Sequence, residues 1–184
     1  MNHEHYSDDY LRDILKSIRT IAVVGASPRP ERPSHRVMAY LRRHGYRAIP
    51  VNPNAAGDTI NGERCFGSLA EVAEPIDMVD IFRRSELAGA AVDDAIVVGA
   101  SVVWMQLGVR DEAAAARAEA SGLKVVMNRC PAIEIPRLGF AHAEPKSRQS
   151  SLATNGARNS RSTGDHLACS GPLAEWPRSL SISK

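Results

Sequence analysis

Basic side chains gather around a glycine turn near the start of the chain. Gly25, Ala26 and Ser27 follow a run of Ile and Val, and four basic residues lie in the next stretch: Arg29, Arg32, His35 and Arg36. Positive charge at a helix N-terminus is unfavourable by roughly 0.3–1 kcal/mol, and a bound anion would remove this conflict. Amides at a helix start and guanidinium groups together bind phosphate. We therefore expect either a phosphate site or a solvated basic loop stiffened by three prolines.

The glycine turn carries only half of a dinucleotide-binding motif. The second and third glycines of G-x-G-x-x-G are absent, so the usual close approach of a pyrophosphate is not encoded. An NAD site also places Asp or Glu about 20 residues after the glycines, to bind the ribose hydroxyls. Asn52 and Pro53 stand there, with no acidic residue before Asp58. This pair would tolerate a phosphorylated ribose or pack against adenine; alternatively, it forms an ordinary Asn-Pro turn.

Two further apolar runs end in residues suited to the wall of a ligand site. Phe82 and Arg83 follow one run and bring an aromatic ring and a guanidinium group. The other run includes Trp104, with Gln106 and Gly108 in the turn after it. A Trp in this position is more often part of the core than of a ligand wall, because its large apolar surface favours burial. Both alternatives stay open for Trp104.

Five short apolar runs, separated by longer amphipathic stretches, must position these side chains. They cover residues 20–24, 47–51, 77–82, 102–105 and 124–127. Four of the five are rich in Val and Ile, as in strands buried on both faces of a parallel sheet. This rhythm predicts an α/β protein with a Rossmann-like doubly wound, mostly parallel five-stranded sheet and flanking helices. Ligands of such folds bind beyond the carboxyl ends of the strands, where the strand order reverses.

Capping residues predict where the helices begin. Ser7 precedes an amphipathic stretch over residues 8–18, and Ser34 precedes one over residues 35–44. Ser68 and Glu71 have the spacing of a capping box, and Asp111 precedes an Ala-rich stretch. We therefore expect a helix after each of these four positions.

The composition divides the 184 residues into three parts. We expect an N-terminal helix packed on the domain over residues 1–19, the domain itself over 20–140, and a disordered Ser-rich tail over 141–184. Residues 1–140 hold 17 basic and 18 acidic residues, and the tail holds 6 and 3. This balance offers no concentrated basic face, so neither nucleic acid nor a membrane surface is expected as a partner.

The cysteines and the N-terminus indicate a cytoplasmic protein. Three widely spaced cysteines fit reduced thiols, and the polar, acidic N-terminus lacks the basic and apolar segments of a secretory signal. The cysteines also lack the close pairs of a zinc site, so no metal is expected. We find no Ser/His/Asp set, no paired carboxylates at a strand end and no G-x-x-x-x-G-K-[ST] motif. The sequence therefore predicts no catalytic residue, and it favours a non-catalytic protein over an enzyme.

Six motifs follow one another along the predicted domain. They are VVGAS at 23–27, RPSHRV at 32–37, GYRAIPVNP at 45–53, DMVDIFRRSE at 77–86, VVWMQLG at 102–108 and GLKVVMNRCPAIEIPRL at 122–138. Together they resemble the coenzyme A-binding domain family of small stand-alone bacterial proteins. They are more distantly similar to the coenzyme A-binding domain of the succinyl-CoA synthetase alpha subunit. The resemblance implies a Rossmann-like domain of the NAD(P)-binding superfamily that binds coenzyme A at the carboxyl ends of its strands.

The resemblance also implies which residues bind the cofactor. They are Gly25, Ala26, Ser27 and Arg36 at the phosphates; Asn52 and Pro53 at the adenosine, with Phe82 and Arg83 at its wall; Trp104, Gln106 and Gly108 beside the pantetheine; and Arg129 and Cys130 near its end. Coenzyme A carries three phosphates and an adenine, so its site needs arginines and flat apolar walls and no acidic ribose ligand. The sequence supplies the arginines and lacks the acid.

Cys130 is the one candidate for covalent chemistry in this site. It lies between Arg129 and Pro131 after the last predicted strand. A neighbouring guanidinium group can lower the pKa of a thiol, which would favour a mixed disulfide with the thiol of coenzyme A. The alternative is a buried structural cysteine.

Three functions remain open at this point. The first is non-catalytic binding of coenzyme A or acyl-CoA, because the phosphorylated-His domain of the related ligases has no counterpart in this chain. The second is an NAD(P)-dependent oxidoreductase, which the missing acid and glycines disfavour. The third is a protein-interaction module with a vestigial nucleotide cleft. An isolated sheet edge would make a homodimer plausible as well.

Overall fold

A parallel five-stranded sheet forms the centre of the protein. The computed structural model describes residues 3–139, so the tail predicted over residues 141–184 lies outside the described residues. All neighbouring strands of the main sheet run parallel. The strands are β1 (Thr20–Val24), β2 (Arg47–Val51), β5 (Met78–Ile81), β6 (Val102–Met105) and β7 (Lys124–Val126). The predicted Rossmann-like α/β class is confirmed.

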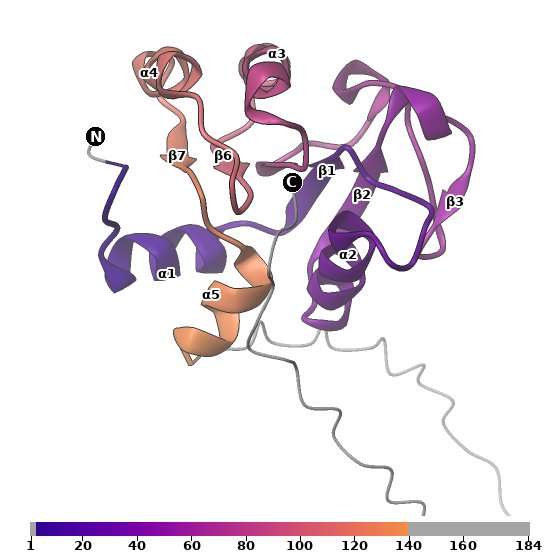
Figure 1. Cartoon of the computed structure of the whole chain (residues 1–184), viewed down its shortest axis with the longest axis horizontal. Coiled ribbons are helices and arrows are strands. Elements are labelled where there is room, and N and C mark those ends of the chain that lie inside the picture. Colours follow the sequence, from indigo (N-terminus) through magenta and orange to yellow (C-terminus); the bar gives the residue numbers. More distant parts are fainter. Residues whose placement is uncertain (1–2, 140–184) are drawn as a thin grey trace, which may run out of the picture. The chain divides into compact units, whose positions relative to one another are not determined.

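Five helices cover the two faces of the sheet (Figure 1). On one face lie α1 (Asp8–Ser17), α2 (Pro33–Arg43) and α5 (Pro131–Arg137); on the other lie α3 (Ser85–Val97) and α4 (Glu112–Ala120). No start was predicted for α3, and α5 was not predicted at all. Two 3-10 turns, η1 (Pro53–Ala55) and η2 (Leu69–Glu71), and a small antiparallel pair, β3 (Thr59–Ile60) with β4 (Glu63–Arg64), fill the connection between β2 and β5. No helix among residues 3–139 has the length and apolar content needed to cross a bilayer.

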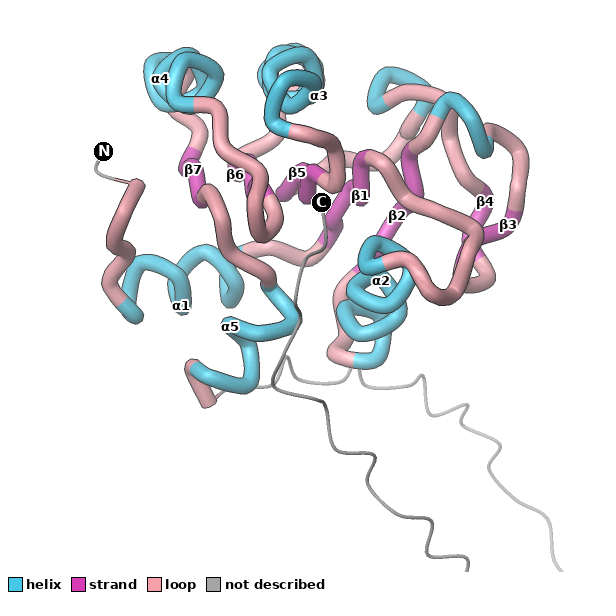
Figure 2. The backbone as a smooth tube through the Cα atoms, viewed as in Figure 1, coloured by secondary structure: helices cyan, strands magenta, loops and turns pink. Residues whose placement is uncertain are grey.

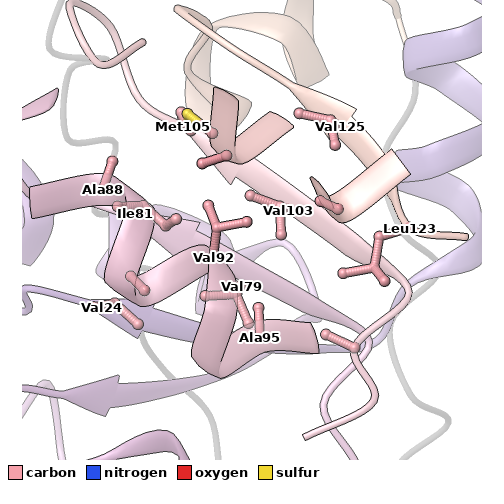
Figure 3. Close-up of a cluster of buried hydrophobic side chains, with 14 of the residues drawn as sticks. Val24, Val79, Ile81, Ala88, Val92, Ala95, Val103, Met105, Leu123 and Val125 are labelled. Atoms are coloured by element: carbon pink, nitrogen blue, oxygen red, sulfur yellow. The ribbon is translucent and has the colours of Figure 1, made fainter. Parts of the chain in front are cut away.

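Small side chains allow α3 and α4 to pack closely on the sheet. The buried residues of these two helices are almost all alanines: Ala88, Ala91 and Ala95 of α3, with Val92, and Ala114, Ala115 and Ala118 of α4. They face β-branched and other apolar residues of the strands, among them Val79, Ile81 and Val103 (Figure 3). Burial of both sheet faces explains why the strands read as continuous apolar runs.

Two of the four predicted helix starts are confirmed and two are wrong. The side chains of Ser7 and Asp111 accept hydrogen bonds from the backbone amides of Tyr10 and Ala114, as N-caps do. Helix α2 instead begins at Pro33, because proline suits the first helical position, and Ser34 is buried inside the first turn.

The capping box predicted at Ser68 and Glu71 starts only the 3-10 turn η2 and no α-helix. The Glu71 carboxylate accepts hydrogen bonds from the Ser68 hydroxyl (3.0 Å) and the Gly67 amide (3.0 Å). These side-chain and loop contacts replace the reciprocal backbone bonds of a capping box. The local motif therefore stabilises a turn that leads into β5.

The strand order is β2-β1-β5-β6-β7, so the direction of the order reverses between β1 and β5 (Figure 2). The turns after these two strands touch. Gly25 has φ +87°, and a Cβ at this position would lie 2.8 Å from the carbonyl oxygen of Phe82. Only glycine combines that backbone angle with such a close approach. The glycine at position 25 is thus required by the packing of one turn against another.

Both outer strands of the sheet are covered within the described part of the chain. Beside β2, the Phe66 amide donates to the Pro50 carbonyl at 3.0 Å. Beside β7, the Tyr10 hydroxyl donates to the Val125 carbonyl at 3.3 Å, and the Met127 amide donates to the Tyr6 hydroxyl at 2.8 Å. The homodimer stays a prediction, but the isolated edge on which it was based is not found among residues 3–139.

Two glycines with the same φ separate the effect of backbone angle from that of the turn contact. Gly122 also has φ +87°, but a Cβ added there would meet no atom within 4 Å. We expect Gly122→Ala to lower the free energy of unfolding by about 1–2 kcal/mol, from the left-handed backbone alone. Gly25→Ala should cost about 1–3 kcal/mol more, because its Cβ meets a backbone carbonyl. Urea unfolding of both variants tests this, and equal losses would contradict it.

Candidate functional site

The first residues after the strands meet at the carboxyl edge of the sheet. Gly25, Asn52 and Phe82 follow the three strands around the switch point, β1, β2 and β5. Gln106 follows β6, and residues 127–130 follow β7 and lead into α5. Parallel strands bring these turns to one side, which is where doubly wound folds bind ligands. The residues predicted for the cofactor site therefore form two groups, one at the switch point and one after β6 and β7.

Asn52 stabilises the glycine turn by a side-chain hydrogen bond. Its side-chain amide donates to the Ala26 carbonyl at 2.7 Å, and its Oδ1 accepts from the Asn54 amide at 3.1 Å. Ala26 is fully buried, and the Ser27 hydroxyl accepts from the Arg29 amide at 3.3 Å. Both polar groups of Asn52 thus form hydrogen bonds within the turns. This matches the Asn-Pro turn that the sequence allowed as the alternative to a ligand contact.

The arginines at the switch point lack acidic partners. Arg32 is the N-cap residue of α2 and Arg36 lies in its first turn; both are exposed, and α2 itself holds no acidic residue. Arg83 follows β5 and is half-buried. None of the three makes an ion pair among residues 3–139. The helix dipole at the start of α2 and these guanidinium groups create a local positive potential. This end of the sheet is suited to an anion.

Apolar surface lies beside these charges. Pro53 is exposed at the start of η1, and the half-buried ring of Phe82 packs against the core cluster under α2 and α5. The switch point therefore combines positive charge with an aromatic ring and a proline ring. Such a surface fits a ligand that has both phosphate groups and a flat ring system.

Trp104 belongs to the core. It is fully buried, and its indole N–H donates to the Arg129 carbonyl at 2.8 Å. Of the two alternatives for Trp104, core or ligand wall, the structure shows the core position, beneath the turn after β7. That turn is fixed further by Asn128, which has φ +54° and whose Oδ1 accepts from the Gly108 amide at 2.8 Å. Gly108 itself is exposed.

The surroundings of Cys130 favour the second of its two alternatives, a buried structural cysteine. Cys130 is 7% exposed, and burial raises the pKa of its thiol to about 12. The Arg129 guanidinium instead lies 5.6 Å from the centre of the Tyr6 ring and 3.8 Å from the Glu134 carboxylate. A buried, protonated thiol is a poor nucleophile. The structural role that the sequence left open for Cys130 is the one its surroundings favour.

Sequence reasoning missed Asp80, a fully buried carboxyl in the middle of β5. The side-chain amide nitrogen of Gln106 donates to both of its oxygens, at 2.7 and 2.9 Å. Burial raises the pKa of Asp80 to about 7, and the hydrogen bonds from Gln106 offset part of that effect. The available signal was an acidic residue at the centre of an apolar run, where a strand buried on both faces has no access to water.

A family model described as a CoA binding domain matches residues 19–136. This chain belongs to the CoA binding domain family. The resemblance that the six sequence motifs predicted is confirmed. The match runs from β1 to the last turn of α5, so it includes the whole sheet and both groups of candidate site residues.

The chain is also similar to curated and solved proteins. The chain is 38% identical over 120 residues to the uncharacterized protein YneT of Bacillus subtilis, covering 65% of this chain and 87% of that protein. It is 38% identical to a hypothetical protein from Pyrococcus horikoshii OT3, with a TM-score of 0.71 and coverage of 75% and 96%. An acetyl-coenzyme A synthetase of Ca. Korarchaeum cryptofilum in complex with phosphate and ADP is 25% identical, with a TM-score of 0.55 and coverage of 65% and 27%.

The raised pKa of Asp80 predicts how stability changes with pH. Between the ordinary pKa of 3.8 and about 7, the unfolded chain loses this proton while the folded protein keeps it. The free energy of unfolding should therefore fall as pH rises through this window, by up to about 1.4 kcal/mol per pH unit from this group. Asp80→Asn removes the titration. The free energy of unfolding of the variant should therefore rise steadily relative to that of wild type from pH 4 to 7. Urea unfolding at several pH values measures the difference, and a constant difference would contradict the assignment.

Proposed function

We propose that this protein binds coenzyme A or acyl-CoA, without catalysing a reaction, at the carboxyl edge of its sheet. The carrying observation is the group of arginines without acidic partners at the switch point, around the start of α2. Membership of the CoA binding domain family supports the same ligand class. The ligand's phosphates would supply the negative charge that this surface lacks.

The ligand would lie across the two groups of site residues. Its phosphates would meet the turn at Gly25, Ala26 and Ser27, with Arg36 and Arg83 beside them. The adenosine would pack near Pro53 and Phe82, whose rings offer apolar surface. The pantetheine arm would run toward Gln106 and Gly108, and end near the turn of Arg129 and Cys130. In this arrangement Asn52 and Trp104 hold the turns in place from inside the protein.

A nicotinamide cofactor fits these surroundings less well. The position after β2 holds Asn52 in place of a carboxylate, and both of its polar groups are engaged in the turns. An NAD ribose would therefore lack its usual acceptor. Among residues 3–139, the one strongly perturbed carboxyl, Asp80, is fully buried, so it is not placed for proton transfer to a bound substrate. These features favour a binding function over an oxidoreductase.

Arginine substitutions test where the phosphates bind. Arg36→Ala and Arg83→Ala should each weaken coenzyme A binding by roughly 10- to 150-fold, because a charged hydrogen bond to phosphate contributes roughly 1.5–3 kcal/mol. Arg43→Ala is the matched control: it is exposed in the last turn of the same helix, away from the switch point, and should leave binding unchanged. Calorimetric titration measures all three. Unchanged affinity in both test variants would refute this placement of the phosphates.

Mass spectrometry of the purified protein tests the ligand itself. Under native conditions, and after denaturation without reductant, we expect release of a coenzyme A or acyl-CoA mass, since the site residues offer non-covalent contacts only. A mass released only by reductant would mean that a cysteine binds the ligand covalently, contrary to the high pKa of the Cys130 thiol. Co-purified NAD or NADP would overturn the proposal in favour of the oxidoreductase. If the protein neither carries coenzyme A nor binds it on titration, the remaining hypothesis is the protein-interaction module.

A further inference from the structure

We propose that Asp80 is a positioning residue for the ligand site. Its buried carboxyl group holds the side chain of Gln106 so that Gln106 Oε1 accepts a hydrogen bond from an amide N–H of the pantetheine arm. The inference rests on the proposed function, because it names the part of coenzyme A or acyl-CoA that would bind at Gln106.

The orientation of Gln106 follows from the chemistry of its partner. Above its pKa of about 7, the Asp80 carboxylate can only accept hydrogen bonds, so the Gln106 amide then turns its NH₂ group toward Asp80. Nε2 does so, at 2.7 and 2.9 Å from the two carboxylate oxygens. Since the two ends of an amide point apart, Oε1 faces away from Asp80. The buried carboxylate thus decides which atom of Gln106 is left for another partner.

Gln106 lies at the carboxyl edge of the sheet, where the proposed ligand would bind. Gln106 is the first residue after β6. Its backbone amide donates to the Ile81 carbonyl at 3.3 Å, which keeps Gln106 level with the end of β5. Its neighbours Leu107 and Gly108 are exposed, whereas Gln106 is 5% exposed. Within residues 3–139, Oε1 has no hydrogen-bond donor. A buried acceptor without a donor is costly, and a donor on a bound ligand would remove that cost.

The position of Gln106 also decides which part of the ligand can reach it. Strand β6 is two strands away from β1, or about 10 Å at the usual spacing. The arginines that suit the phosphates lie around β1 and α2, so the group at Gln106 belongs to the other end of the molecule. Ionised phosphates accept and do not donate, whereas the pantetheine arm carries two secondary amide N–H groups. An acceptor at this position is therefore complementary to the pantetheine arm.

A purely structural role does not account for Asp80. It is fully buried at the centre of β5, beside Trp104 in the neighbouring strand, and an apolar side chain would fill that position at lower cost. The thiol of Cys130, at the start of α5, is the titratable group close enough to interact with it. No basic side chain in the described part of the chain pairs with Asp80. A residue that departs from the local rules of folding in this way is typical of a functional site.

Two ligands separate positioning from folding. We would titrate coenzyme A, and adenosine 3′,5′-bisphosphate, which lacks the pantetheine arm, at pH 8.5 where Asp80 is ionised. Gln106→Met and Asp80→Leu should each weaken coenzyme A binding about threefold to tenfold, as expected for one lost hydrogen bond. Both variants should bind adenosine 3′,5′-bisphosphate as wild type does. Ser101→Ala, at the exposed opposite end of β6, is the control and should bind both ligands normally.

The double variant tests whether Asp80 acts through Gln106. If it does, Asp80→Leu should weaken coenzyme A binding no further in a protein that already carries Gln106→Met. Additive losses, equal losses for both ligands, or unchanged coenzyme A binding in Gln106→Met would each overturn the inference while the proposed function stands. A wild-type protein that binds neither ligand would overturn both.

Discussion

The contact between two turns at the switch point constrains the rest of the candidate site. The backbone of Gly25 lies so close to the Phe82 carbonyl that no other side chain fits at this position without a shift. Backbone hydrogen bonds from Gly25 to Val51 and from Phe82 to Val24 extend the sheet into both turns, so β2, β1 and β5 end at one level. From this line α2 leaves over one face and α3 over the other. The starts of both helices therefore flank the place where a ligand would bind.

Charge is distributed unevenly over a body that is close to neutral. Arg47, Arg117 and Arg137 all pair with carboxylates on other elements, away from the switch point. Exposed pairs of this kind add little to stability. Their effect here is electrostatic: they neutralise charge over most of the surface, while Arg36 and Arg83 keep theirs beside the glycine turn. A local anion site can thus exist in a protein without an overall basic character.

The sequence predicted the elements of the fold better than the contacts between them. The strands were recognisable because burial on both faces leaves an apolar run, and Ser7 and Asp111 were recognisable because their capping bonds are local. Ser34 was assigned wrongly because Pro33 competes for the start of the same helix. Short elements such as α5 and the β3–β4 pair carry too few residues for a periodic pattern, so they were not predicted.

The amino-acid sequence by itself determined the fold class, the family and the types of residue that end each strand. Only the tertiary structure decided which of these residues are buried and which are exposed, because strand order and side-chain direction depend on contacts far apart in the chain. Trp104 is in the core since its indole N–H meets a carbonyl 25 residues away. Burial raises the pKa of the Cys130 thiol, and that burial exists only in the folded chain. The Asp80 carboxyl accepts hydrogen bonds from Gln106, 26 residues later, and that pairing exists only when β5 and β6 lie side by side.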